Sequence, residues 1–275
     1  MKITIDKRKK LLSKAVEASI NAGKEILKVY YSDNFDVEIK KDKTPLTLAD
    51  KAAHNEIIDI LEKTNIPILS EEGKSIDYNE RKKWEYFWLV DPLDGTKEFI
   101  KKNDEFTVNI ALIYNGNPIS GIIYVPVLKL LYVGDVEIGS YLINSIDTYS
   151  NIDNLIKIGQ KLPKATKPNL FTIVGSRSHM NKETEDFMAV FKEKYGYVDI
   201  ISKGSSLKLC MVAEGLANIY PRFAPTMEWD TAAGHAIALG ANCTVTQQDQ
   251  KTPLTYNKEN LLNPWFIVKQ KDVDI

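Results

Sequence analysis

Apolar residues recur at helical intervals in two segments near the start of the chain. The first predicts one long helix over residues 12–30, and the second predicts a helix over residues 48–63. Thr47 can cap this second helix, because Asp50 follows three residues later in the spacing of a capping box. Each helix has one apolar face, so we expect both to pack on a sheet.

Short apolar runs predict strands between residues 86 and 143. Residues 86–90 are apolar throughout, as expected of a buried strand, and this strand should stop at Asp91-Pro92. Asn115-Gly116 is a favourable hairpin turn. The further strands are expected over residues 106–114, 119–125, 130–133 and 140–143. This part of the chain should therefore form two helices on a largely antiparallel sheet.

Helical and strand patterns alternate after residue 150, which is typical of an α/β unit. The expected elements are strands over residues 170–174, 197–201, 216–220 and 243–246, and helices over residues 182–194, 206–214 and 230–239. We predict an N-terminal α+β half over residues 1–150 and a C-terminal α/β half over residues 151–275. Residues 151–168 could equally be a surface insertion.

The charge balance argues against a nucleic-acid polymer as partner. The chain has 36 basic and 37 acidic residues, so it has no strong overall field. The basic run Lys7-Arg8-Lys9-Lys10 is expected to be a solvated helix face, with peripheral contact to the cytoplasmic face of the inner membrane as the lesser alternative. Cys210 and Cys243 are expected to be buried free thiols of a cytoplasmic protein.

The first residues lack an apolar signal core, and no stretch approaches the roughly 20 apolar residues of a membrane span. No transmembrane segment is therefore expected. The sequence indicates no particular oligomeric state.

The run Asp91-Pro92-Leu93-Asp94-Gly95-Thr96 combines two carboxylates with a turn at the end of a predicted buried strand. Asp91, Asp94 and the Leu93 carbonyl could converge on Mg²⁺, which prefers oxygen ligands. Gly95 and Thr96 lead into a predicted helical turn, whose unpaired amides suit a phosphate. An ordinary turn with a capping aspartate explains the isolated run about equally well.

The spacing of the two aspartates separates this run from one other phosphatase motif. Haloacid-dehalogenase phosphatases use Asp-x-Asp, whereas this chain has Asp-x-x-Asp, so an aspartyl-phosphate intermediate is disfavoured.

Three further acidic positions are ambiguous when each is considered alone. Glu71-Glu72 follows a short apolar run, where a solvated pair is the commoner outcome. Asp50 and Asp230 are both expected to be helix-start residues, Asp230 as the N-cap of the helix that follows it.

Taken in order, these acidic segments resemble the lithium-sensitive, Mg²⁺-dependent phosphomonoesterases of the inositol monophosphatase family. The segments that carry the resemblance are Asp50, Glu71-Glu72, residues 91–96 and Trp229-Asp230-Thr231-Ala232-Ala233. Residues 89–113, 175–179 (Gly-Ser-Arg-Ser-His), 204–208 (Gly-Ser-Ser-Leu-Lys) and 212–236 are similar to the CysQ-type bisphosphate nucleotidases within that family.

The resemblance implies a five-layered αβαβα sandwich with the active site between the two halves. It also implies two Mg²⁺ ions, and the family admits a third, weaker site near Glu71. By resemblance, Glu71, Asp91 and the Leu93 carbonyl would hold one ion. Asp91, Asp94 and Asp230 would hold the second.

The implied reaction is hydrolysis by a metal-activated water without a covalent intermediate. Thr96 would orient the water, and Asp50 or Glu71 would accept its proton. The implied substrate is 3'-phosphoadenosine 5'-phosphate, a by-product of sulfate assimilation, which would yield AMP and phosphate. The residues expected to contact it are Glu71, Leu93, Asp94, Gly95, Thr96, Arg177, His179, Ser205, Ser206, Lys208 and Asp230.

Two alternatives remain at this point. An inositol or sugar phosphate phosphatase of the same family would keep the metal ligands and change the pocket formed by residues 175–208. A metal- or nucleotide-binding regulatory protein without turnover is disfavoured, because simple binding does not require a water-orienting threonine.

Overall fold

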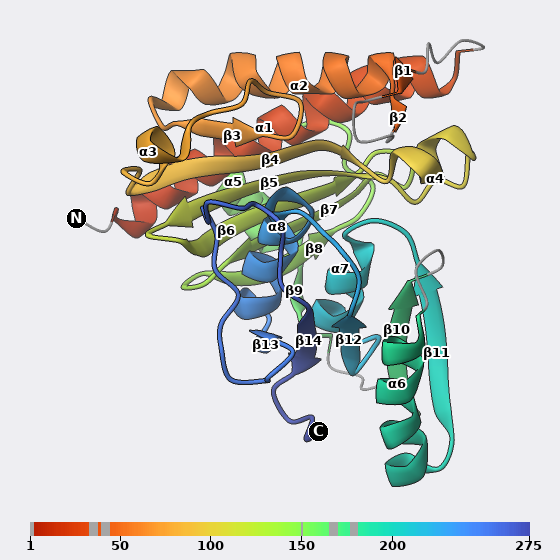
Figure 1. Cartoon of the computed structure of the whole chain (residues 1–275). Helices are drawn as coiled ribbons and strands as arrows, with labels where there is room; N and C mark the ends of the chain where they lie inside the picture. Colours follow the sequence, from red (N-terminus) through yellow and green to blue (C-terminus); the bar gives the residue numbers. More distant parts are fainter. Residues whose placement is uncertain (1–2, 33–37, 40–44, 150, 165–169, 177–180) are drawn as a thin grey trace.

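The computed structural model describes residues 3–32, 38–39, 45–149, 151–164, 170–176 and 181–275, and it stacks helices and sheets in five alternating layers (Figure 1). The helical layers are α1 (Ile5–Tyr30) with α2 (Leu48–Leu61), then α7 (Leu207–Glu214) with α8 (Glu228–Gly240), and finally α6 (Lys182–Tyr195). A seven-stranded sheet lies between the first and second helical layers, and a five-stranded sheet lies between the second and third helical layers. The predicted αβαβα sandwich is confirmed.

The seven-stranded sheet follows the order of its strands along the chain. Its first two strands are parallel and every later pair is antiparallel, so the sheet is largely antiparallel, as predicted, and the parallel pair is an addition to that prediction. Asn115 and Gly116 both have positive φ, as the predicted hairpin turn requires. The strands are β3 (Ile68–Ser70), β4 (Tyr86–Asp94), β5 (Thr107–Tyr114), β6 (Asn117–Val125), β7 (Leu130–Asp135), β8 (Gly139–Ile143) and β9 (Gln160–Leu162).

β4 does not stop at Asp91-Pro92, so that prediction was wrong. Pairing with β5 resumes at Asp94, after a register shift between Asp91 and Asp94. Proline lacks the N–H that a regular ladder needs, so it is accommodated at this irregularity. Both aspartates are therefore held by the sheet.

The five-stranded sheet has the order β11-β10-β12-β14-β13. β10 runs parallel to both of its neighbours, and β14 runs antiparallel to both of its own. The strands are β10 (Phe171–Ser176), β11 (Val198–Lys203), β12 (Ile219–Arg222), β13 (Cys243–Gln247) and β14 (Phe266–Gln270). The hydrophobic pattern above does not predict β14. The seven-stranded sheet runs on to Leu162, and a division of the chain at residue 150 stays a prediction.

The remaining elements are short. They are β1 (Glu38–Ile39), β2 (Pro45–Leu46), the 3-10 turn η1 (Glu62–Thr64), α3 (Tyr78–Arg81), α4 (Thr96–Ile100) and α5 (Ile152–Ile158). Cys210 and Cys243 are buried free thiols, as predicted. Among the described residues, no helix combines the length and the apolar character that crossing a membrane requires.

The basic run at the start of α1 is not wholly a solvated face. Arg8 is completely buried, and its guanidinium lies 3.4 Å from Asp135 and 2.7 Å from Glu137. The expectation of a solvated face was therefore wrong for Arg8, because acidic residues of β7 and the turn after it lie against this position of the helix.

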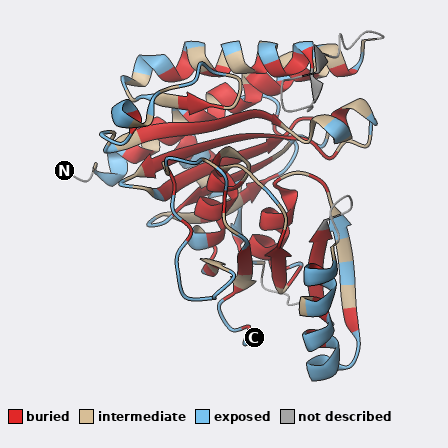
Figure 2. Ribbon diagram, viewed as in Figure 1, coloured by how far each residue is buried: buried red, intermediate tan, exposed pale blue. Residues whose placement is uncertain are grey.

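Two glycines allow α8 to lie directly on the seven-stranded sheet, where buried residues fill both layers (Figure 2). A Cβ atom on Gly121 would lie 2.3 Å from the backbone oxygen of Ala233. A Cβ atom on Gly134 would lie 2.5 Å from the Cα atom of Ile237. Because both contacts are with helix backbone, any side chain at these positions would displace α8 from the sheet.

Gly121→Ala should destabilise the protein by about 1–3 kcal/mol, the usual cost of overpacking a filled core. The free energy of unfolding from urea denaturation is the measurement. An unchanged midpoint would contradict the tight contact between β6 and α8.

Candidate active site

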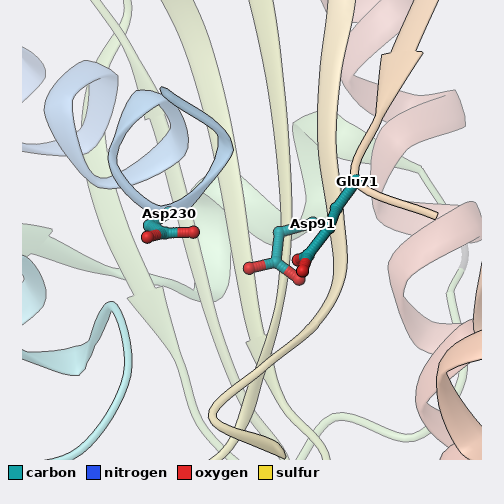
Figure 3. Close-up of side chains that lie close together, drawn as sticks. All are labelled: Glu71, Asp91 and Asp230. Carbon is teal, nitrogen blue, oxygen red and sulfur yellow. The ribbon is translucent and has the colours of Figure 1, made fainter. Parts of the chain in front are cut away.

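Three carboxylates from different elements meet between the layers. Glu71, Asp91 and Asp230 each offer an oxygen atom, and these atoms lie within 4.8 Å of one another (Figure 3). Glu71 and Asp91 are adjacent because they follow Ser70 and Val90, which pair in register on the parallel strands β3 and β4. The Glu71 N–H also donates to the Val90 carbonyl at 3.1 Å. The group therefore depends on strand pairing and on the position of α8.

Backbone donors orient two of these carboxylates. Asp91 Oδ1 accepts the N–H of Leu93 at 3.0 Å. Asp230 Oδ2 accepts the N–H of Met227 at 2.9 Å, which places Asp230 inside the first turn of α8. The prediction that Asp230 is an N-cap was wrong, because the helix begins two residues earlier, at Glu228.

Asp50 completes the capping box of α2 as predicted, and it also lies beside Thr96, the last residue of the run from Asp91 to Thr96. The Thr47 N–H and hydroxyl both donate to Asp50 Oδ2, at 2.8 and 2.5 Å, which confirms the capping box. The Thr96 hydroxyl lies 3.5 Å from Asp50 Oδ1 and 3.5 Å from the Leu93 carbonyl oxygen. Gly95 precedes α4 in the left-handed region, at φ 93°. Asp50, Leu93 and Thr96 thus converge as predicted.

Asp94, at the end of β4, is contacted from both sheet and helix. The Asn109 amide donates to Asp94 Oδ2 at 3.3 Å, and the backbone amide of Ser206 acts to lower the pKa of the same carboxylate. Lys208 is close enough to oppose the charge of Asp94. Asp94 therefore lies where the acidic group meets residues of α7.

Burial raises the pKa values of Asp91, Asp94 and Asp230, and repulsion from neighbouring site carboxylates adds to the effect at Asp91 and Asp230. The pKa of Asp91 is raised well above its ordinary value by burial first, then by Glu71, Asp94 and Asp230. Burial, followed by the charge of Asp94, raises the pKa of Asp230 to about 8. Burial also raises the pKa of Asp94, against the opposing effect of Lys208. Carboxylate oxygens that repel one another fit a hard divalent cation, which would relieve the repulsion.

A cationic pocket adjoins the acidic group. Its lining includes Asp94, Lys203, Ser205, Lys208 and Arg222. Lys208 is 7% exposed, and its ammonium donates to the Ser205 carbonyl. Burial lowers the pKa of Lys208 to about 8, although nearby Asp94 opposes this shift. Among the described residues, Arg222 Nε and Ser205 Oγ are buried without a hydrogen-bond partner, so the pocket has unused donors that suit an anion.

The structure brings most of the predicted site residues to one place. The residues that converge are Asp50, Glu71, Asp91, Leu93, Asp94, Gly95, Thr96, Ser205, Ser206, Lys208 and Asp230. Arg177 and His179 lie outside the described residues. Ser206 is 2% exposed, and its hydroxyl is hydrogen-bonded to neighbouring side chains. Its role as a substrate ligand stays a prediction.

Two residues with contacts in the site have no role in the sequence analysis. Arg222 ends an otherwise apolar strand, and this isolated charge is a signal that could have indicated a pocket residue. Asn109 lies within the fully buried strand β5, where a lone amide similarly requires polar partners.

The comparisons with known proteins cover nearly the whole chain. Residues 7–271 match the model of the inositol monophosphatase family. The chain is 42% identical over 262 residues to the 3'(2'),5'-bisphosphate nucleotidase CysQ of Escherichia coli (strain K12), covering 94% of this chain and 99% of that protein.

Solved structures agree with these sequence relatives. The crystal structure of CysQ from Bacteroides thetaiotaomicron, described as a bacterial member of the inositol monophosphatase family, has a TM-score of 0.89 and 49% identity. That match covers 96% of this chain and 98% of the other. A staphylococcal inositol monophosphatase, at 22% identity and a TM-score of 0.68, shares the fold. The chain therefore belongs to the inositol monophosphatase family.

Proposed function

We propose that this protein is a Mg²⁺-dependent 3'(2'),5'-bisphosphate nucleotidase that hydrolyses 3'-phosphoadenosine 5'-phosphate to AMP and phosphate. One observation carries the proposal: the acidic group of Glu71, Asp91 and Asp230 adjoins a cationic pocket that contains Lys208 and Arg222. Relatives that carry this enzyme's name are 42% identical over nearly the full chain.

The donor set supports two Mg²⁺ ions. Glu71, Asp91 and the Leu93 carbonyl would hold one ion, and Asp91, Asp94 and Asp230 would hold the second. Bound Mg²⁺ would lower the pKa of a coordinated water and stabilise charge on the phosphate oxygens.

Thr96 would orient the attacking water, and Asp50 would accept its proton. The Thr96 hydroxyl can donate to Asp50 or to the Leu93 carbonyl, and its lone pairs can then accept from a water molecule. Asp50 Oδ2 is fixed by Thr47, which leaves Oδ1 as the carboxylate oxygen that faces Thr96. The proton would pass to Asp50, with Glu71 as the other acceptor.

The cationic pocket favours a substrate with a second anionic group. Lys208 and Arg222 line the same pocket as Asp94 and would pair with the 5'-phosphate of a bisphosphate nucleotide. The Ser205 hydroxyl would donate there, and Arg177 and His179 are proposed for the same side. An inositol monophosphate has no second phosphate for these cations.

Phosphate release in Mg²⁺ tests the proposal directly, with 3'-phosphoadenosine 5'-phosphate and inositol 1-phosphate at matched concentrations. A strong preference for the nucleotide is expected. Preference for inositol phosphate would keep the metal chemistry and overturn the substrate. Release from neither would leave a binding protein as the better interpretation.

Asp91→Asn should lower kcat by at least about 1,000-fold, because it removes a ligand charge shared by both proposed ions. The same change should raise the melting temperature without metal, since it removes a buried carboxylate whose pKa is raised by its neighbours. Steady-state kinetics and thermal unfolding in EDTA are the two measurements. A variant that remains active would refute the metal assignment.

Arg222→Ala should raise KM for the bisphosphate nucleotide about 10- to 100-fold, the usual worth of a charge-assisted hydrogen bond. Turnover of a simple phosphate monoester should change much less, and Arg177→Ala should show the same difference. Equal losses on both substrates would remove the assignment of this pocket to the second phosphate.

The raised pKa of Asp230 predicts how metal-free stability depends on pH. Its folded-state pKa of about 8 exceeds the roughly 3.9 of an unfolded chain. Its contribution is therefore complete below about pH 4 and is lost as the pH rises towards 8. In EDTA, the free energy of unfolding should fall more steeply with pH in the wild type than in Asp230→Asn, by up to about 1.4 kcal/mol per pH unit. Parallel curves would contradict the prediction.

A further inference from the structure

Three buried polar side chains form a continuous hydrogen-bonded chain that ends on Asp94. The Thr107 and Ser206 hydroxyls lie 2.8 Å apart, and both contact the amide oxygen of Asn109, at 3.1 and 2.8 Å. The Asn109 amide nitrogen then donates to Asp94 Oδ2 at 3.3 Å. Thr107, Asn109 and Ser206 are each at most 2% exposed.

A register shift in the sheet directs the Asp94 side chain towards this hydrogen-bonded network. Asp91 pairs with Asn109 and Asp94 pairs with Thr107, so three steps along β4 oppose two steps along β5. One extra residue in a strand bends it and redirects its side chains. The carboxylate of Asp94 therefore lies within reach of Asn109, two residues beyond its own strand partner.

The network fixes which way the Asn109 amide points. An ionised carboxylate can only accept, so the end of the amide that faces Asp94 is the nitrogen. The amide oxygen then lies at the other end, where it accepts from the two hydroxyl groups. A carboxylate with a fixed donor on one oxygen has a defined orientation for a cation.

Ser206 links this network to the other side of the site. Its hydroxyl donates to the Asn109 amide oxygen at 2.8 Å and lies 2.8 Å from the Thr107 hydroxyl. The preceding loop is attached to the segment that leads into β5, because Glu105 accepts the Gly204 N–H at 2.8 Å and pairs with Lys203 at 3.1 Å. Residues 204–206 border the cationic pocket, and Ser206 connects it through Asn109 to Asp94.

We propose that Asn109, Ser206 and Thr107 are positioning residues, which hold Asp94 in the orientation that binds a divalent cation. The proposal rests on the proposed metal-dependent function. It adds Thr107 and Asn109, and it assigns the Ser206 hydroxyl to Asn109 in place of the predicted substrate contact. The adjacent residues Ser205 and Ser206 then have different roles. Ser206 turns its hydroxyl into the network, whereas the buried hydroxyl of Ser205 has no hydrogen-bond partner within the described part of the chain and lines the pocket.

The test is Mg²⁺ and Mn²⁺ binding to the full chain, measured by isothermal titration calorimetry without substrate. Asn109→Ala and Ser206→Ala should each weaken binding about 10- to 100-fold, as is usual when a ligand loses its supporting hydrogen bond. The double variant should bind the cation about as weakly as Asn109→Ala alone, because both substitutions interrupt the same hydrogen-bonded network.

Two serine variants serve as matched controls. Ser205→Ala removes the neighbouring hydroxyl and should leave metal affinity unchanged. Ser140→Ala removes an equally buried hydroxyl on β8, which donates to Ile237 at 2.7 Å, and it should lower only the stability. A merely structural role for Ser206 would make Ser206→Ala behave like Ser140→Ala.

The outcomes separate this inference from the proposed function. Wild-type affinity in Ser206→Ala would overturn the positioning role even if Asn109→Ala failed to fold. Independent, additive losses in the double variant would also overturn it. A wild-type chain that binds neither cation would overturn the metal-dependent function together with this inference.

Discussion

Mutual repulsion among buried carboxylates is the constraint around which this structure is arranged. Burial raises the pKa values of Asp91 and Asp230, and the charges of neighbouring carboxylates raise them further. Three features hold these carboxylates together or offset their charge in the absence of a cation. Parallel pairing of β3 and β4 fixes Glu71 beside Asp91, the start of α8 offers its dipole to Asp230, and Lys208 faces Asp94. A divalent cation would relieve what remains.

This arrangement explains why the helix between the sheets must lie so close to the strands. α8 brings Asp230 to the acidic group, and its approach is possible only because Gly121 and Gly134 have no side chain. A small displacement of α8 would move one carboxylate away from the other two. Packing of the core and geometry of the site are therefore the same constraint at these glycines.

Much of the site could be predicted from the sequence, because its acidic residues occur in short local signals. The capping box of Thr47 and Asp50 and the run from Asp91 to Thr96 depend on neighbours in the chain. Other features depend on distant partners. Arg8 is buried because Asp135 lies against it, and Ser206 contacts Asn109 although the two are 97 positions apart. No local pattern contains such contacts.

The acidic and cationic sides of the site are formed by different structural elements. The residues proposed for metal binding and catalysis are therefore distinct from those proposed to select the substrate. The acidic side uses strand ends and the start of α8, where the backbone positions are set by sheet pairing and close helix packing. The cationic side uses Lys208 of α7 and Arg222 of β12, which line the pocket. Ser206 is where the two sides meet, because one residue holds Asp94 and borders the pocket. A change of substrate within this fold should therefore be easier at Arg222 than at Ser206.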